Sequence, residues 1–125
     1  MHVSRDELEP MVLGEYEGRS VDAGELRIAF ESMPAQFPPD ESPFKGLPDD
    51  RCQCPHWGYV IAGKVTFRFE DREESFEAGD AFFTPPGHVP VKHEPGSEVV
   101  MFSPAEELHK TEAVMMKNLQ ALQPA

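Results

Sequence analysis

The sequence predicts a single all-β domain that folds as a barrel and ends in a short helix. Thirteen prolines and nine glycines divide the 125 residues into short apolar stretches, and this spacing is typical of a β-sandwich or β-barrel. Several stretches alternate apolar and polar residues, as half-buried strands do. The length suits one domain with one hydrophobic core. We therefore expect a single domain over residues 1–125, with an N-terminal arm at 1–23, a barrel at 24–102 and a helix at 104–122.

The predicted strands follow one another with turns between them. The expected strands are 26–30, 57–60, 65–69, 75–77, 81–84 and 99–102. In the third of these, Val65, Phe67 and Phe69 share one face, because side chains two apart in a strand point the same way. A proline-rich loop from Pro34 to Pro48 separates the first two strands. We expect this loop to lie over a small-molecule pocket.

The C-terminal helix has a start signal and an apolar face. Ser103 is the expected N-cap and Pro104 the first helical residue. Glu106, three residues after the cap, completes a capping box. We expect a stripe of apolar side chains along this helix to pack on the barrel or on a second subunit. Its members are Leu108, Met115, Leu119 and Leu122.

The composition excludes some partners and favours one compartment. Twenty-three acidic residues against eleven basic ones give a formal net charge of −12, which repels nucleic acids and anionic lipid surfaces. The chain has no apolar run as long as a membrane span and no apolar N-terminal segment. We therefore expect a cytoplasmic protein. In that reducing compartment Cys52 and Cys54, one residue apart, are expected as free thiols rather than as a disulfide.

Residues 46–90 resemble the two sequence motifs of the cupin superfamily. The second motif, G-x5-P-x-G, matches Gly79, Pro85 and Gly87, and the strand and turn that end the first motif match residues 59–63. These glycines and prolines are the residues that tight β-turns require. The resemblance implies a small single-domain cupin, a jelly-roll β-barrel whose interior commonly holds a metal ion and a small ligand.

The chain departs from the family pattern at every metal-ligand position. Counting from the motif glycines places His56 where the family has glutamate, Asp50 and Cys52 at the two histidines of the first motif, and Pro90 at the histidine of the second. Strand geometry offers replacements, since His88 lies two residues before Pro90 and can face the same interior. Asp50, Cys52, Cys54 and His56 likewise share one parity.

These residues predict a mononuclear divalent metal site inside the barrel. The predicted ligands are His56 and His88 with a thiol from Cys54 or Cys52; zinc suits this donor set, and iron would suit it if Asp50 replaced the thiol. Three protein ligands leave a position open for substrate. The resemblance implies an oxygenase, isomerase or lyase acting on a small organic acid, ketone or sugar derivative.

Two other functions remain open from the sequence. Without a metal, His56 and His88 are candidate catalytic residues of an acid–base isomerase or lyase, and the barrel is equally suited to a non-catalytic sensor of small molecules. His93, beside a turn, is expected in solvent.

A row of large side chains predicts an interface. Trp57, Tyr59 and Ile61 have the opposite parity to His56 and should point out of the barrel. An exposed patch of this size is unfavourable in water, so we expect it to be buried against the arm, the helix or the second subunit of a homodimer.

Overall fold

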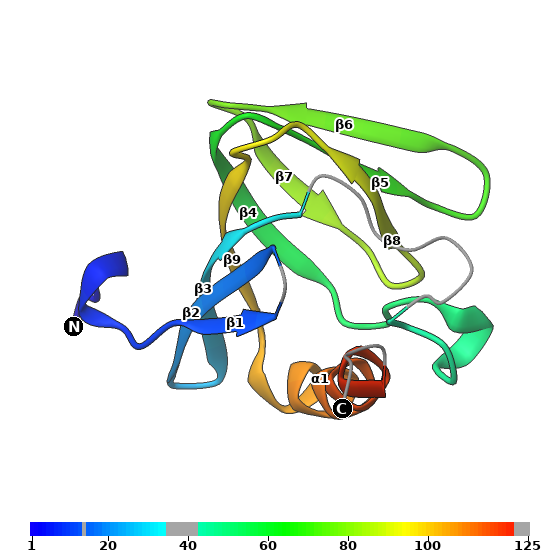
Figure 1. Ribbon diagram of the computed structural model, residues 1–125, viewed down its shortest axis with the longest axis horizontal. Coiled ribbons are helices and arrows are strands. Elements are labelled where there is room, and N and C mark those ends of the chain that lie inside the picture. The colour runs from blue at the N-terminus through cyan, green and yellow to red at the C-terminus, as the bar shows by residue number, and fades with distance from the viewer. Residues whose placement is uncertain (14, 35–42, 122–125) are drawn as a thin grey trace.

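The computed structural model describes residues 1–13, 15–34 and 43–121, and it arranges nine strands in two antiparallel sheets (Figure 1). The strands are β1 (Met11–Leu13), β2 (Tyr16–Ala23), β3 (Leu26–Ser32), β4 (His56–Ala62), β5 (Lys64–Arg68), β6 (Glu73–Glu77), β7 (Ala81–Thr84), β8 (Val89–His93) and β9 (Glu98–Pro104). Two 3-10 turns, η1 (Arg5–Glu7) and η2 (Pro48–Asp50), and one helix, α1 (Ala105–Ala121), complete the described elements.

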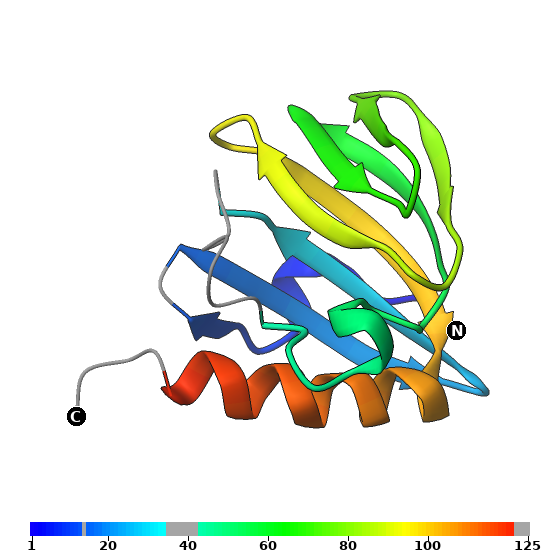
Figure 2. The ribbon, with the colours of Figure 1, turned by 90° about the vertical axis from the view of Figure 1, so that its right-hand side faces the viewer.

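The two sheets face each other as the halves of an open barrel. The larger has the order β1-β2-β3-β9-β4-β7 and the smaller the order β6-β5-β8. Among the described strands, no backbone ladder joins one sheet to the other. Figure 2 shows α1 running alongside the β2–β3 half of the larger sheet, away from the smaller sheet. The architecture is the jelly roll with a C-terminal helix that the sequence predicted.

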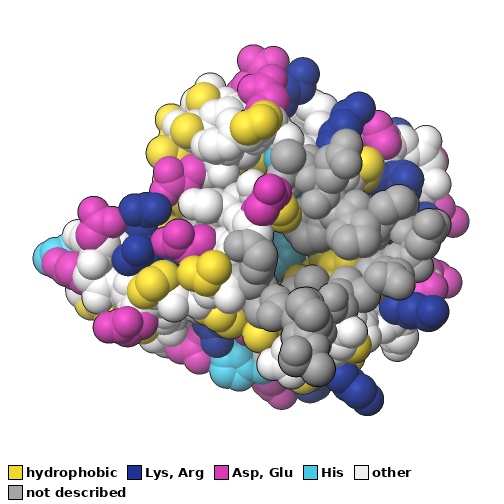
Figure 3. Space-filling model, viewed as in Figure 1, with side chains coloured by type: hydrophobic (Ala, Val, Ile, Leu, Met, Phe, Trp, Pro, Cys, Tyr) yellow, Lys and Arg dark blue, Asp and Glu magenta, His cyan; other side chains and the backbone are white. Residues whose placement is uncertain are grey.

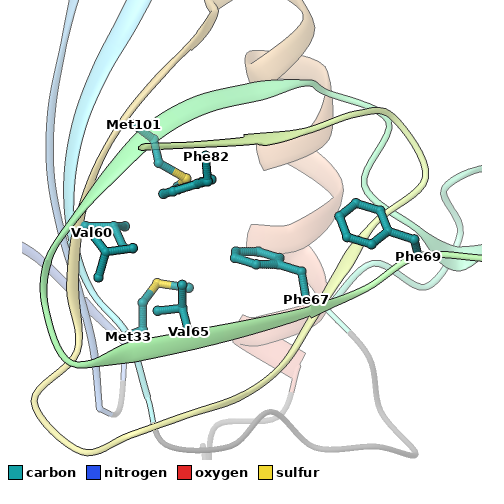
Figure 4. Close-up of a cluster of buried hydrophobic side chains, with 8 residues drawn as sticks. Met33, Val60, Val65, Phe67, Phe69, Phe82 and Met101 are labelled. Atoms are coloured by element: carbon teal, nitrogen blue, oxygen red, sulfur yellow. The ribbon is translucent and has the colours of Figure 1, made fainter. Parts of the chain in front are cut away.

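The main core lies between the sheets. Figure 4 shows side chains from β4, β5, β7 and β9 converging on the barrel interior. The buried members are Met33, Val60, Val65, Phe67, Phe69, Phe82, Val99 and Met101. Burying each large apolar side chain contributes about 1.5–3 kcal/mol. The predicted shared face of Val65, Phe67 and Phe69 is confirmed.

Glycines at the tight turns explain the partial family motif. Gly79 and Gly87 have φ values of +97° and +95°, a region that residues with a Cβ atom rarely adopt. The motif spacing therefore records turn geometry that the fold needs, whether or not the ligand residues are retained.

The predicted strands all form, and three further strands were missed. The segment expected as an arm, residues 1–23, carries β1 and β2, and β2 pairs with β3 from Glu17 to Ala23. β8 was missed because it contains Pro90, which argues against a strand. β8 pairs with β5 and lies at the edge of the smaller sheet, where a proline is tolerated.

The predicted N-cap of the helix is wrong. Ser103 belongs to β9 and is 2% exposed, and its hydroxyl contacts the His56 ring instead of capping the helix. The helix begins at Ala105, whose N–H donates to the Glu25 carbonyl. An N-cap signal in the sequence was overridden by a tertiary contact inside the barrel.

The helix covers a second, smaller apolar cluster. Leu108 and Met115 of the predicted stripe pack there with Phe44, Cys52 and Cys54; the Leu119 side chain and Leu122 lie outside the described residues. No helix in the described part of the chain has the length and hydropathy needed to cross a membrane.

Candidate metal centre

Three of the four predicted metal ligands meet inside the barrel. One ligand atom each from Cys52, His56 and His88 lies within 4.8 Å of the other two. All three side chains are buried, with exposed fractions of 2%, 7% and 1%. The two imidazole rings meet edge to face with their centroids 4.9 Å apart. Three potential ligands from segments up to 36 positions apart thus form one buried group.

The backbone brings Cys52 and His88 together. The Cys52 N–H donates to the His88 carbonyl at 2.9 Å, and the Gly87 N–H donates to the Cys52 carbonyl at 2.8 Å. With the His88 N–H, which donates to the same Cys52 carbonyl at 3.3 Å, Cys52 and His88 form an isolated antiparallel bridge between the loop before β4 and the turn before β8. His56 is the first residue of β4. The turns and the bridge therefore fix the three side chains relative to one another.

Each imidazole is oriented by a second contact. His56 Nδ1 lies 2.6 Å from Ser103 Oγ, and His88 Nδ1 lies 2.7 Å from the Pro85 carbonyl oxygen. A carbonyl accepts, so His88 Nδ1 carries the proton and its Nε2 keeps a free lone pair. Histidines that bind metals in proteins are typically held by such contacts. Because these contacts occupy the Nδ1 atom of each ring, Nε2 is the nitrogen that each ring has left to bind a metal.

Burial keeps all three groups neutral. Desolvation lowers the pKa of His56 to about 3 and also lowers the pKa of His88. Burial raises the pKa of Cys52 to about 11. Neutral imidazole is the form that binds metal, whereas the thiol must lose its proton to do so. A divalent cation would supply the positive charge that the buried thiolate lacks.

The spacing and the donor types suit zinc. Cys52 Sγ lies 3.6 Å from His56 Nε2. Tetrahedral zinc, with Zn–S near 2.3 Å and Zn–N near 2.0–2.1 Å, puts sulfur and nitrogen ligands about 3.6 Å apart. One sulfur and two nitrogens form a borderline-soft set that favours zinc over calcium or magnesium. The residues present therefore fit a zinc ion with one position open.

Two other candidates from the sequence lie outside the group. The Cys54 thiol contacts the carbonyls of Pro55 and Pro104 at 3.6 and 4.0 Å, with its own pKa raised by burial to about 12. The Asp50 carboxylate is exposed and accepts from the Gly46 N–H. Neither belongs to the potential ligand group among the described residues. Both cysteines are free thiols, as expected.

A buried hydroxyl beside the group has no partner. Thr84 pairs with His56 across β4 and β7, so the two side chains point to the same face. Thr84 is fully buried, and its Oγ1 has no hydrogen-bond partner among the described residues. An unpaired buried hydroxyl costs about 1–3 kcal/mol. A polar ligand next to the metal would satisfy it, and no motif in the sequence pointed to this residue.

An open pocket lies at the mouth of the barrel near His88. The pocket has a volume of about 630 Å³. Its lining includes Arg51, Gln53, Phe69, Arg72, Pro85 and Gly87. Phe69 lines this pocket and also meets the His88 ring at a centroid distance of 6.5 Å, and the Arg72 guanidinium lies 5.0 Å from the Phe69 ring centroid. Phe69 and Pro85, whose carbonyl holds His88 Nδ1, therefore connect the pocket with the metal group.

Two further expectations can be compared with the structure. His93, expected in solvent, is only 6% exposed, and its Nδ1 accepts from the Thr66 N–H; that expectation was wrong. The pocket was expected beneath the loop from Pro34 to Pro48, but residues 35–42 of that loop lie outside the described residues.

Comparisons with known proteins agree on the fold. The profile of the AraC-like ligand binding domain matches residues 55–98. An RmlC-like cupin from Shewanella frigidimarina superposes with a TM-score of 0.60 over 86% of this chain and 93% of that chain, at 19% identity. This chain has the cupin fold. A search of curated proteins finds no match to this sequence.

Two further structures resemble this chain. The polyketide cyclase RemF from Streptomyces resistomycificus matches with a TM-score of 0.59 at 20% identity, covering 83% of this chain and 78% of that one. A variant of oxalate decarboxylase from Bacillus subtilis matches with a TM-score of 0.59 at 13% identity, covering 82% of this chain but 28% of the larger protein. Identities this low support the shared fold alone.

Proposed function

We propose that this cupin is a small-molecule enzyme with one divalent metal ion, zinc by preference, held by Cys52, His56 and His88. The main support for the proposal is that three potential ligand atoms, all from buried side chains, lie within 4.8 Å of one another. In the family these positions, or their neighbours, supply the metal ligands. The chain replaces each family ligand, yet a metal-binding set of different residues occupies the same interior.

The ion would supply Lewis-acid chemistry at the open position. Ser103 and the Pro85 carbonyl orient the two imidazoles. Phe67 and Phe69 pack against His88 and keep water away from it. The pocket of about 630 Å³ that Phe69 lines is the proposed route for the substrate.

The metal-independent alternative receives less support. A general acid or base works best when its pKa lies near the working pH. Burial lowers the pKa of His56 to about 3, so at neutral pH this imidazole lacks the acidic proton of the imidazolium form and is a weak base. The same neutral ring is well suited to bind a metal.

A non-catalytic sensor is a second candidate, favoured by a separate observation. The matched residues 55–98 of the AraC-like ligand binding profile include His56, His88 and most of the barrel. In such a protein the same site would retain a small molecule without converting it. The free thiols are consistent with either function in a reducing cytoplasm.

Native mass spectrometry and turnover assays distinguish the candidates. The zinc-loaded and chelator-treated proteins would be incubated with small organic acids, ketones and sugar derivatives. An enzyme is expected to form product only when metal-loaded. Product formation should also be lost in Phe69→Trp, because the larger side chain narrows the pocket through which the substrate is proposed to enter. A ligand retained without product would favour the sensor. Equal product from both forms would contradict the metal-dependent function.

Thr84→Val tests whether a polar ligand adjoins the metal. Valine has nearly the same shape as threonine, and in the free protein it removes an unpaired hydroxyl, so urea unfolding should show unchanged or higher stability by about 1 kcal/mol. Ligand or substrate affinity should fall about tenfold if the hydroxyl pairs with that ligand. Lower stability of the free variant would show that Thr84 Oγ1 already has a partner.

We also propose that the protein forms a homodimer through the outer face of the larger sheet. Trp57, Tyr59, Ile61, Phe83 and Phe102 are 38–48% exposed there, and Trp57 stacks on Phe83 with ring centroids 5.1 Å apart. The arm and helix leave this face uncovered. It presents roughly 400 Å² of apolar surface. Two such faces would bury about 800 Å² of apolar surface, and their polar rims would bring the total toward about 1,200 Å², the lower range of stable interfaces.

The choice of a second copy rests on charge as well as area. Acidic side chains are spread over the face of the molecule seen in Figure 3, and the net charge is −12. Contacts between two copies are therefore favourable only where the surface is uncharged. The five apolar side chains form such a surface.

Trp57→Lys is expected to convert the dimer to a monomer. Loss of a central tryptophan weakens an interface by at least about 2 kcal/mol, and light scattering coupled to size exclusion would report the mass. Val12→Lys is the matched control, because Val12 is 59% exposed on β1, which lies at the opposite edge of the larger sheet from β4 and β7. A monomeric wild-type protein, or a dimer unaffected by Trp57→Lys, would contradict this interface.

A further inference from the structure

A second cavity lies outside the metal centre, between the β2–β3 half of the larger sheet and α1. Its volume is about 330 Å³, which is within the usual range for small-ligand pockets. Its apolar walls come from both the sheet and the helix. They include Met11, Ala29, Leu108, Ala113 and Met116. None of the three proposed metal ligands lines it.

Glu31 places a carboxylate in this cavity without a cation beside it. Tyr16 donates a hydrogen bond from its hydroxyl to Glu31 Oε1 at 3.2 Å. Among the described residues, no lysine, arginine or histidine forms an ion pair with Glu31. The Glu31 side chain is partly buried, and a carboxylate withdrawn from water is costly unless a positive charge accompanies it.

The arrangement of Tyr16 and Glu31 depends on a glycine. Gly18 pairs with Glu31 across β2 and β3. A Cβ atom at Gly18 would lie 2.5 Å from the Tyr16 hydroxyl oxygen. The missing side chain therefore leaves the space through which the phenol reaches Glu31.

The arginines that line the cavity are already paired. Arg19 donates to Glu17 and to the Leu8 carbonyl. Arg27 forms ion pairs with Asp22 and Glu112. These pairs leave neither guanidinium to neutralise Glu31 or to attract an anion. The unmatched charge in the cavity is therefore negative.

We propose that the cavity between β2, β3 and α1 binds a small organic cation, a protonated amine with an apolar body, through the Glu31 carboxylate. The ammonium group pairs with Glu31 and completes the charge that the protein leaves unmatched. The apolar body packs on the methionine, leucine and alanine side chains of the walls. Neutral alcohols of the same shape gain the packing without the ion pair, and carboxylates are repelled. This site is independent of the metal-centred function.

Benzylamine, benzyl alcohol and benzoate are the probes, with binding measured by calorimetry on the full chain. Benzylamine is expected to bind at least about tenfold more tightly than benzyl alcohol, and benzoate least. Glu31→Gln keeps the size of the side chain and a hydrogen bond to Tyr16. This substitution should weaken the binding of benzylamine at least about tenfold and leave the binding of benzyl alcohol unchanged. Glu106→Gln is the matched control, since Glu106 is exposed on α1 and does not line the cavity.

Amines also bind metals, so Cys52→Ser separates the two sites. Benzylamine binding that persists in Cys52→Ser and falls in Glu31→Gln supports the cavity. Loss in Cys52→Ser with no change in Glu31→Gln would place the amine at the metal centre and overturn the proposal. The proposal would also be overturned if the amine and the alcohol bound equally well, or if no probe bound. It would be overturned as well if Glu106→Gln weakened benzylamine binding as much as Glu31→Gln does.

Discussion

His88→Ala is expected to reduce the metal content of the anaerobically purified protein from near one ion per chain to below about one in ten. His88 is 1% exposed and its Nδ1 is held by the Pro85 carbonyl, so no other side chain can readily take its place. Loss of even an outer-shell contact costs about 10–100-fold in metal affinity, and loss of a ligand costs more. His56→Ala and Cys52→Ser should behave in the same way. Elemental analysis by mass spectrometry measures the effect.

Cys54→Ser is the matched control for these variants. Cys54 is also a buried cysteine, two residues from Cys52, but its thiol points to the carbonyls of Pro55 and Pro104. The metal content of Cys54→Ser should equal that of the wild type. Metal bound equally by the wild type, His56→Ala and His88→Ala would show that the ion lies elsewhere. A loss in Cys54→Ser alone would assign the thiol ligand to Cys54.

Glu31→Gln is expected to make the protein more stable than the wild type above pH 7 and no more stable near pH 4.5. Burial raises the pKa of Glu31 from 4.5 to about 7, with a contribution from the charge of Glu112 and against the hydrogen bond from Tyr16. Between these pH values the folded state keeps a proton that the unfolded state has lost. Wild-type stability therefore falls as pH rises through this window, whereas glutamine has no proton to lose.

The size of the Glu31 effect follows from the shift. Each pKa unit is worth about 1.4 kcal/mol, and partial access to the cavity reduces the full value, so we expect a relative gain of about 2 kcal/mol for Glu31→Gln between pH 5 and pH 8. Urea unfolding at the two pH values measures it. Glu106→Gln, exposed on α1, should show no such pH dependence relative to the wild type. Parallel stability curves for the wild type and Glu31→Gln would contradict a buried, uncompensated carboxylate.

Much of the barrel could be predicted because local patterns and tertiary structure agree in it. The alternation in Val65–Phe69 corresponds to a strand whose apolar face fills the core. The exceptions are places where tertiary contacts override a local signal. Ser103 has the sequence context of a helix cap but hydrogen-bonds His56 inside the barrel. Pro90 argues against β8 in the sequence, yet an edge strand accommodates it.

The site could be predicted in its residue types but not in its partners. Strand parity placed His56 and His88 in one interior, and the structure brings them together. Parity could not separate Cys52 from Cys54, because the chain before β4 is not a regular strand and the choice depends on the bridge from Cys52 to His88. Glu31 and Thr84 carry no motif at all. Thr84 is significant because its hydroxyl has no hydrogen-bond partner, and Glu31 because no cation pairs with it, among the described residues; both become visible only in three dimensions.

The most direct test of the metal centre is X-ray absorption spectroscopy of the zinc-loaded protein at the zinc edge. We expect one sulfur neighbour near 2.3 Å and nitrogen or oxygen neighbours near 2.0–2.1 Å, with an imidazole outer-shell signal from two histidines. In Cys52→Ser the sulfur neighbour should disappear, and in Cys54→Ser it should remain. A zinc ion with no sulfur neighbour, with two, or with one that survives in Cys52→Ser would contradict a site made by Cys52, His56 and His88.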